Sequence, residues 1–401
     1  MLIRKAFRYR IYPTREQIGK ADRWSDAQRF LWNLAHEQRL LGLARERSER
    51  CYPTAFDQAK ELTELRSELP WLADVPRNVS MQLLHELDQA WQRCFKKLAE
   101  APRWKRKGVD VVNLCEPHPK VWKLVGSTLH FPKLGKIRAI VHRPLDGTPK
   151  SCTLVRDGDQ WFASIVCAIE IPDPIPRTGP TIAIDRGITN FAGTSDGKLI
   201  PGPQYLKASL KQLARAQRKV SRRKKGSKNY QKAARMLMRR NRKVRRQRAH
   251  FSHVESARYA KSHGVIVLED LNIAGMMRGN SARGIADAGW SMFEQMLRYK
   301  QCWSGGAVKL VWAAYSSQEC DHCGHIDATS RRGEAFCCTK CGHTDHADIN
   351  AAKVLLRRAN RSALPVEGEL LEGALRSRKA KVELRVPRRS SLQEPRPLGR
   401  G

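Results

Sequence analysis

Four cysteines in two matched pairs carry the clearest chemical signal in this 401-residue chain. Cys320 and Cys323 form the first pair, and Cys338 and Cys341 form the second after an interval of fourteen residues. Two Cys-x2-Cys pairs at this separation can place four thiolates around one tetrahedral Zn²⁺. A segment this short cannot bury a core of its own, so the metal would supply its folding energy. The pattern predicts one structural zinc ion in a ribbon.

The ligand set has alternatives in the same stretch of sequence. His343 or His346 could replace one cysteine, and Cys337 could replace its neighbour Cys338. Free core cysteines are the other alternative, but they would leave the matched pairing unexplained. Most of the remaining cysteines are single and scattered, which argues against a secreted disulfide framework and favours a reducing cytoplasm.

Three carboxylates lie at the ends of predicted elements. Asp185 and Glu269 each end a short apolar strand, and Asp348 begins a helix seven residues after the last paired cysteine. Converging carboxylates repel one another unless cations neutralise them, and hard oxygen ligands select Mg²⁺ or Mn²⁺. Two such ions about 3.5–4 Å apart can activate a water and stabilise the leaving oxygen in phosphodiester cleavage. The three residues are therefore candidate ligands of two catalytic ions.

Each carboxylate also has a simpler explanation. Asp185 could be a turn residue before a glycine, Asp348 could cap a helix, and Glu269 could pair with one of many arginines. Asp270 is the rival to Glu269, but alternation along a strand points the two side chains to opposite faces.

The net charge of +36 points to a polyanionic partner, namely nucleic acid. A membrane surface is disfavoured because the chain has no run of eighteen apolar residues and no signal peptide at its start. We therefore expect a cytoplasmic, nucleoid-associated protein with no membrane partner.

The cations are concentrated in the middle of the chain. No acidic residue occurs between Asp196 and Glu255, while twenty Lys or Arg residues do. A disordered basic tail is one explanation, but apolar residues at helical spacing favour two basic helices within residues 203–260, joined at Gly226. Such a hairpin could lie along phosphates without reading sequence. The candidate nucleic-acid-binding residues are Arg222, Arg223, Lys224, Lys225, Lys228, Arg239, Arg240, Arg245 and Arg246.

The periodicity of the sequence divides the remaining chain into segments. Residues 3–12 alternate as a strand, Thr14 and Gln17 form a capping box, and a helical pattern follows to about residue 100. An apolar stripe there contains Leu84, Leu87, Trp91, Phe95 and Leu98. Strands are then expected at 125–131, 137–142, 152–155 and 161–169, with a turn at 157–158, in a small antiparallel barrel or sheet that the opening strand could join. A proline-rich stretch at 171–180 marks a domain boundary. Three buried strands and a helix follow it, and a tail without periodicity ends the chain.

These segments, taken in order, resemble the TnpB/OrfB proteins of bacterial insertion sequences. The strand ending Ile184-Asp-Arg-Gly187 is one such motif, and single motifs are weak evidence while the ordered set is specific. The resemblance covers nearly the whole chain, through residues 5–14, 87–91, 184–187, 221–227, 268–271, 287–290, 317–318 and 348–352.

The resemblance implies a multidomain α+β fold. A helical recognition lobe would be inserted in a wedge-like β-barrel, followed by an RNase H-like (RuvC) α/β nuclease domain that a zinc ribbon interrupts. The implied segments are the first wedge strand (1–13), the recognition lobe (14–108), the rest of the wedge (109–178), the RuvC domain (179–314), the ribbon (315–345), the last RuvC helix (346–360) and a basic, disordered tail (361–401).

The resemblance also implies an activity and partners. Asp185, Glu269 and Asp348 match the family's catalytic triad, and the four paired cysteines match its zinc ligands. Members are RNA-guided DNA endonucleases whose guide comes from the transposon end and which cleave double-stranded DNA beside a short motif. A separate transposase of the same element would join strands. Three rival hypotheses remain: a miniature type V CRISPR effector, a nuclease-inactive RNA-guided repressor, and a plain zinc-ribbon binding protein.

Overall fold

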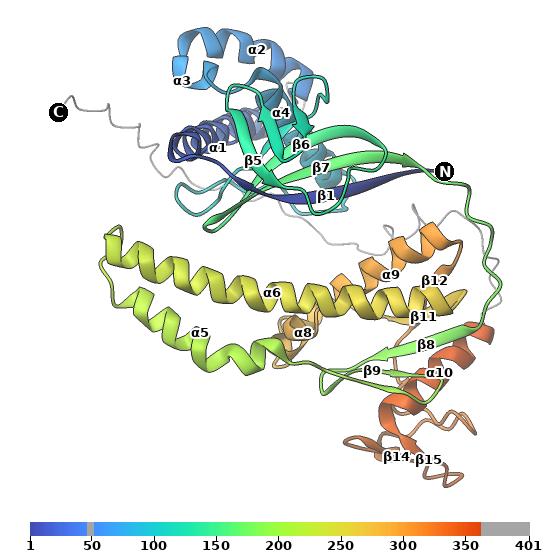
Figure 1. Ribbon diagram of the computed structural model, residues 1–401. Coiled ribbons are helices and arrows are strands. Elements are labelled where there is room, and N and C mark those ends of the chain that lie inside the picture. The colour runs from blue at the N-terminus through green and yellow to red at the C-terminus, as the bar shows by residue number, and fades with distance from the viewer. Residues whose placement is uncertain (46–51, 362–401) are drawn as a thin grey trace.

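The computed structural model describes residues 1–45 and 52–361 and contains two large sheets with helices around them (Figure 1). The first sheet and its helices come from the N-terminal part of the chain. The second sheet, the two basic helices and a small three-stranded sheet come from the rest. The predicted tail lies outside the described residues apart from Arg361, which ends the last helix.

The first sheet has seven antiparallel strands in the order β2-β6-β7-β1-β5-β4-β3. The prediction that the opening strand joins this sheet is confirmed, because β1 lies between β7 and β5. One strand prediction was wrong: residues 125–131 are not a single strand, because Gly126 adopts a φ of 53° and turns the chain between β3 and β4. The strands are β1 (Leu2–Tyr12), β2 (Leu114–Glu116), β3 (Lys123–Val125), β4 (Thr128–Phe131), β5 (Gly135–Ile140), β6 (Thr148–Asp157) and β7 (Gln160–Glu170).

Two helices, α1 and α4, contact this sheet at β2, and α2 and α3 pack against these helices. Thr14 and Gln17 form the predicted capping box at the start of the first of them. The predicted stripe is only partly buried: Trp91 is in the core, but Phe95 is 45% exposed. The stripe stops there because the chain leaves the helix through a φ of 56° at Lys97. The helices are α1 (Arg15–Ala44), α2 (Ala55–Glu68), α3 (Pro70–Ala73) and α4 (Arg77–Phe95).

The second sheet has five strands in the order β10-β9-β8-β11-β12. Strands β8, β11 and β12 are mutually parallel, whereas β9 and β10 continue antiparallel from β8. The parallel strands are apolar on both sides because helices cover both faces. The strands are β8 (Thr181–Arg186), β9 (Asn190–Thr194), β10 (Leu199–Pro201), β11 (Val265–Asp270) and β12 (Ala307–Trp312).

Helices on the two faces of this sheet bury different residues of the same strands. Ile184 and Leu268 pack toward α9, while Ala183 and Val267 pack toward α10. The predicted basic helices are confirmed as α5 and α6, which flank Gly226. None of the helices in the described part of the chain is long and apolar enough to cross a membrane. The helices are α5 (Tyr205–Ser221), α6 (Lys228–Ser262), α7 (Ile273–Met276), α8 (Ala282–Ala288), α9 (Trp290–Ser304) and α10 (Ala347–Arg361).

Candidate active site and zinc ribbon

Strand alternation places Asp185 and Glu269 on one face of the five-stranded sheet. In the neighbouring strands β8 and β11, Ala183 lies opposite Val267. Both of these side chains pack against Leu355 of α10. The two carboxylates follow two residues later, so they project on the same face. Glu269 is buried and its rival Asp270 is exposed, as the alternation predicts.

Asp348 reaches the same place from the first turn of α10. Gly193 of β9 lies opposite Asp185 in the pairing of β8 with β9. The backbone of Asp348 lies directly over this glycine, where an added Cβ would come within 2.6 Å of the Asp348 carbonyl. The structure therefore brings the three predicted carboxylates together, and each is only 7% exposed.

The protonation of this trio reflects its burial. Burial raises the pKa of Asp185 well above its ordinary value, and the nearby charges of Glu269 and Asp348 raise it further. Burial also raises the pKa of Glu269, which accepts a hydrogen bond from Asp185. A carboxyl group that is protonated in this way can ionise when a cation compensates its charge. The donor set suits a hard divalent cation.

Two arginines close to the carboxylates were missed by the sequence analysis. Arg331 of the ribbon pairs with Asp348 at 3.2 Å. Its positive charge offsets a small part of the rise in the pKa of Asp185. Arg186 is buried, donates to the backbone oxygen of Glu269, and pairs with Glu294 at 2.9 Å. Spacing gave no signal for Arg331, because only the folded ribbon brings it to α10.

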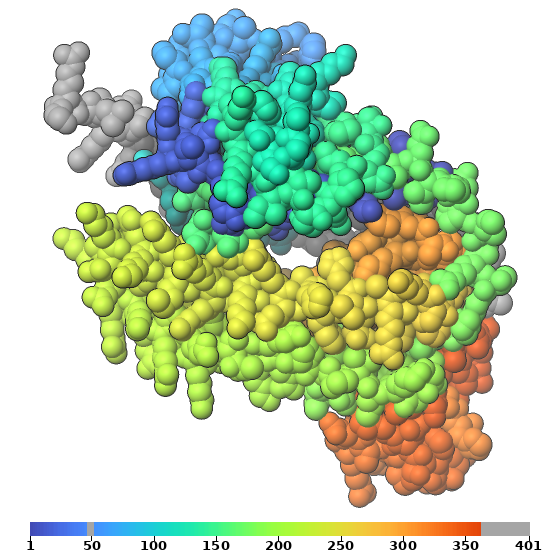
Figure 2. Space-filling view, viewed as in Figure 1, coloured from blue at the N-terminus to red at the C-terminus, as the bar shows by residue number. Residues whose placement is uncertain are grey.

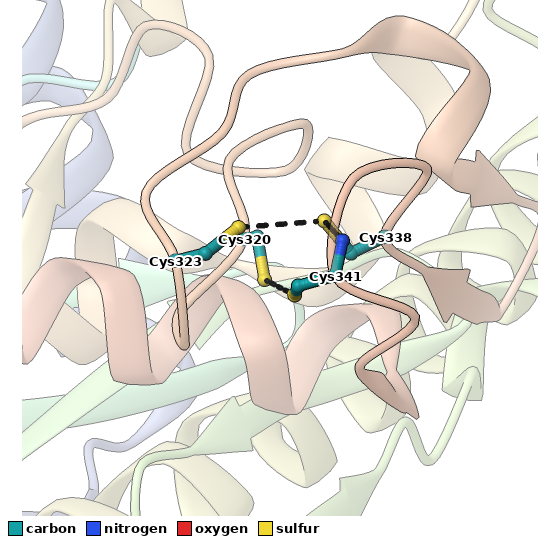
Figure 3. Close-up of side chains that lie close together, drawn as sticks. All are labelled: Cys320, Cys323, Cys338 and Cys341. Carbon is teal, nitrogen blue, oxygen red and sulfur yellow. Dashed lines mark hydrogen bonds between the residues drawn. The ribbon is translucent and has the colours of Figure 1, made fainter.

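The four paired cysteines form a compact cluster (Figure 3). The Sγ atoms of Cys320 and Cys341 are 3.7 Å apart, and those of Cys323 and Cys338 are 3.6 Å apart. A tetrahedral zinc with Zn–S bonds of about 2.3 Å has sulfur–sulfur edges of about 3.8 Å. The sulfurs therefore already have the spacing that one zinc ion requires.

The alternative zinc ligands lie elsewhere. Cys337 is exposed at the end of β14, outside the cluster. His346 accepts a hydrogen bond through Nδ1 from the backbone N–H of Asp348 at 3.2 Å. It thereby caps the first turn of α10. The small sheet of the ribbon consists of β13 (Arg331–Arg332), β14 (Ala335–Cys337) and β15 (Thr344–His346).

The ribbon is mounted directly on α10. Asn350 donates to the backbone oxygen of Glu319 at 2.7 Å and accepts from the N–H of Asp321 at 3.0 Å. Glu319 is also held by Arg357 and by Arg358, whose Nε lies 3.0 Å away. Both sides of the first cysteine are thus tied to the helix that begins with Asp348. The folding of the ribbon and the position of Asp348 are coupled.

The candidate nucleic-acid-binding residues divide into two groups. Arg222, Arg223, Lys224, Lys225 and Lys228 lie in or beside the turn between α5 and α6, and none of them is buried. The other four lie along α6 and make protein contacts. Arg239 and Arg245 pair with Asp159 and Asp157, Arg246 donates to Gln160, and Arg240 donates to the backbone oxygen of Gln212.

Comparison with known proteins decides the family. The chain is 30% identical over 377 residues to "Putative RNA-guided DNA endonuclease InsQ" of Escherichia coli K12, covering 88% of this chain and 91% of the relative. The chain belongs to the OrfB family. A second member, "Putative RNA-guided DNA endonuclease" of Streptomyces pristinaespiralis, is 31% identical over 363 residues. The alignment covers 88% of this chain and 89% of the relative.

Three family models match separate parts of the chain. Residues 164–280 match the OrfB IS605 model, described as "Probable transposase", and residues 290–355 match the Cas12f1-like TNB domain. Residues 1–40 match a helix-turn-helix model of the same family, although the structure has one strand and one continuous helix there. A solved structure of the mini-RNA-guided endonuclease CRISPR-Cas_phi3 aligns with this chain at 10% identity and a TM-score of 0.47. The alignment covers 91% of this chain and 93% of the chain in that structure.

Proposed function

We propose that this OrfB-family chain is an RNA-guided DNA endonuclease of a transposable element, with Asp185, Glu269 and Asp348 as its catalytic carboxylates. The convergence of these side chains on one face of the β8–β11 sheet carries the proposal. The names of the relatives agree with this activity. The guide RNA would come from the transposon end, and cleavage would occur beside a short target-adjacent motif.

The proposed domains follow the same reasoning. The five-stranded sheet with α9 and α10 on its two faces would be an RNase H-like RuvC domain, beginning near residue 179 and interrupted by the ribbon at 315–345. The seven-stranded sheet would be the wedge, with the helices of residues 14–108 as the recognition lobe. Strand joining would fall to a separate transposase of the element.

The proposed chemistry requires cations at the carboxylates. Two Mg²⁺ or Mn²⁺ ions, when bound, would activate water and stabilise the leaving oxygen. Asp185 and Glu269 would lose their shared proton and hold these ions, and Asp348 would complete the set. Arg331, which pairs with Asp348, stands where it could donate to a phosphate oxygen. The exposed cations of the α5–α6 turn would contact phosphates without reading sequence.

The adjacent acidic pair at the end of β11 gives a sharp test of the function. Glu269→Gln should lower guided plasmid cleavage by at least about 10²-fold, because the loss of one charge-stabilising group at a reaction centre costs about 10²–10³ in rate. Asp270→Asn should retain cleavage within a factor of a few, because this side chain is exposed on the other face. The assay uses protein co-expressed with its flanking transcript, a matched plasmid and Mg²⁺.

Three outcomes would contradict the proposal. Equal cleavage by the wild type and Glu269→Gln would remove the catalytic assignment. Wild-type protein that carries no discrete RNA would remove guided targeting, and guides from a repeat array would favour a CRISPR effector. Wild-type protein that binds its guide and target but leaves the target intact would favour the repressor hypothesis.

Gly193 tests the packing that positions Asp348. Gly193→Ala should reduce cleavage by at least about tenfold and lower the melting temperature, because its Cβ would meet the Asp348 backbone at 2.6 Å and overpacking costs about 1–3 kcal/mol. Gly279→Ala is the control, since its Cβ would meet its nearest neighbour at an ordinary 3.6 Å. Full activity in Gly193→Ala would show that Asp348 does not need this contact.

A further inference from the structure

The N-terminal sheet lies beside α6 (Figures 1 and 2), and six arginines gather where the two meet. Two aspartates of the β6–β7 turn face them. Asp157 pairs with Arg245 at 2.5 Å, and Asp159 pairs with Arg242 at 2.6 Å. Six guanidinium groups against two carboxylates leave this cluster with an excess of four positive charges. Its arginines are Arg8 and Arg10 of β1 and Arg239, Arg242, Arg245 and Arg246 of α6.

Three of these arginines surround one aromatic ring. The guanidinium carbons of Arg8, Arg10 and Arg246 lie 4.1, 5.3 and 5.7 Å from the centre of the Phe162 ring. Phe162 lies opposite Arg10 in the pairing of β1 with β7. The ring is only 9% exposed, and it lies on the sheet face opposite the core residues Phe7 and Tyr9. The cations cover the ring, and the ring holds them close together.

Arg10 has buried donors that find no acceptor. In the described part of the chain, its Nε and Nη1 atoms are buried without a hydrogen-bond partner. A buried donor without an acceptor costs about 1–3 kcal/mol, and more when it is charged. Burial lowers the pKa of Arg8 and Arg246, neighbouring arginines lower both further, and Asp157 offsets part of each shift. Asp157 pairs with Arg245 and lies 3.9 Å from Arg8, whereas Arg10 and Arg246 form no ion pair within the described residues. The three side chains therefore share one carboxylate that is already paired elsewhere.

We propose that Arg8, Arg10 and Arg246 form a phosphate-binding site between the seven-stranded sheet and α6, and that its occupant is a backbone phosphate of the guide RNA. A phosphate offers several acceptor oxygens to guanidinium forks and brings the charge that the cluster lacks. The choice of RNA rests on the proposed function: a guided nuclease binds its guide before its target, so the guide is the first polyanion to meet the cluster. Because β1 and α6 both contribute, a bound phosphate would tie the two parts of the protein together.

The test compares arginines of the same strand. Arg4 lies on the same face of β1 as Arg10, is exposed, and is outside the cluster, so Arg4→Gln removes the same charge. Binding of the purified guide transcript is measured over a salt titration for the wild type, Arg10→Gln and Arg4→Gln. Arg10→Gln should weaken binding about tenfold and reduce the slope of log K against log salt by about 0.7, as expected for one lost phosphate contact on a single strand. Arg4→Gln should change the RNA affinity and the salt slope less than Arg10→Gln does.

The melting temperature of the RNA-free protein distinguishes a role of Arg10 in RNA binding from a role in stabilising the fold. Arg10→Gln should raise or preserve the melting temperature, because it removes buried charge that has no partner. A lower melting temperature with unchanged RNA affinity would overturn the proposal, and so would an affinity equal to that of Arg4→Gln. Weaker binding of target DNA with unchanged binding of the guide would overturn the assignment to RNA. Each of these outcomes would overturn the phosphate site while wild-type protein still performs guided cleavage. Absence of guided cleavage by the wild type would instead overturn the proposed function.

Discussion

Asp185→Asn should abolish guided cleavage while raising the melting temperature of the metal-free protein by a few degrees. The side chain is buried, hydrogen-bonded to Glu269, and close to Asp348. Its ionised form is therefore unfavourable in the fold unless a cation is bound. An amide keeps the shape and the hydrogen bond but brings no charge. Cleavage should fall at least about 10³-fold, since a single stabilising donor at a reaction centre is already worth about 10²–10³.

The measurement pairs a cleavage assay with thermal unfolding in EDTA. Asp196→Asn is the matched control, because this aspartate is stabilised in its ionised form. It pairs with Lys198 at 2.6 Å. Partial burial would raise its pKa, but hydrogen bonds from Lys198 and Thr194 outweigh this effect and lower the pKa. The control should keep cleavage and melt at the same or a lower temperature. An Asp185→Asn protein that melts well below the wild type would contradict the view that this carboxylate destabilises the metal-free fold.

The pH dependence of stability follows from the same two carboxylates. The folded-state pKa values of Asp185 and Glu269 are raised, so the folded protein holds protons that the unfolded chain releases. The stabilisation is complete below the ordinary carboxyl pKa and is lost as the pH rises through the folded pKa values. Saturating Mg²⁺ should remove this loss at neutral pH, because bound cations favour the ionised forms.

Local chemistry made much of this site predictable from the sequence. Apolar strands that end in Asp185 and Glu269 could be recognised because a parallel sheet buries both faces of its strands. Alternation predicted that Glu269 and Asp270 lie on opposite faces of their strand. The cysteine spacing identified the zinc cluster, since four thiolates close around the metal within one short segment.

Long-range contacts explain what the sequence could not predict. Arg331 meets Asp348 only because the ribbon folds back onto α10. Arg239 and Arg245 were predicted to bind nucleic acid, and no local pattern indicated that they also pair with the β6–β7 turn about eighty residues earlier in the chain. The hairpin β3–β4 was missed because its turn at Gly126 lies inside residues 125–131, which were interpreted as one strand. Helical and strand periods report which side of an element is buried, but not which distant element covers it.

Replacing Cys320 and Cys338 with serine should release the zinc and abolish cleavage, although neither residue touches the carboxylates. Zinc binding supplies the folding energy of a segment this small. Asn350 and Arg357 of α10 bond to the backbone beside Cys320, so an unfolded ribbon would leave the start of α10 without these contacts. Asp348 would then lose its position, and Arg331 would no longer reach it. Metal content, protease sensitivity of residues 315–345 and guided cleavage are measured together.

Cys337→Ser is the matched control for the zinc prediction, because this cysteine is adjacent to Cys338 but exposed and outside the cluster. It should retain one zinc per chain and full cleavage. Guide RNA binding should survive in the double serine variant, since the arginine cluster between β1 and α6 does not depend on the ribbon. A double variant that has lost its zinc yet still cleaves would show that α10 positions Asp348 without the ribbon. A double variant that keeps its zinc would contradict the assignment of these cysteines as ligands.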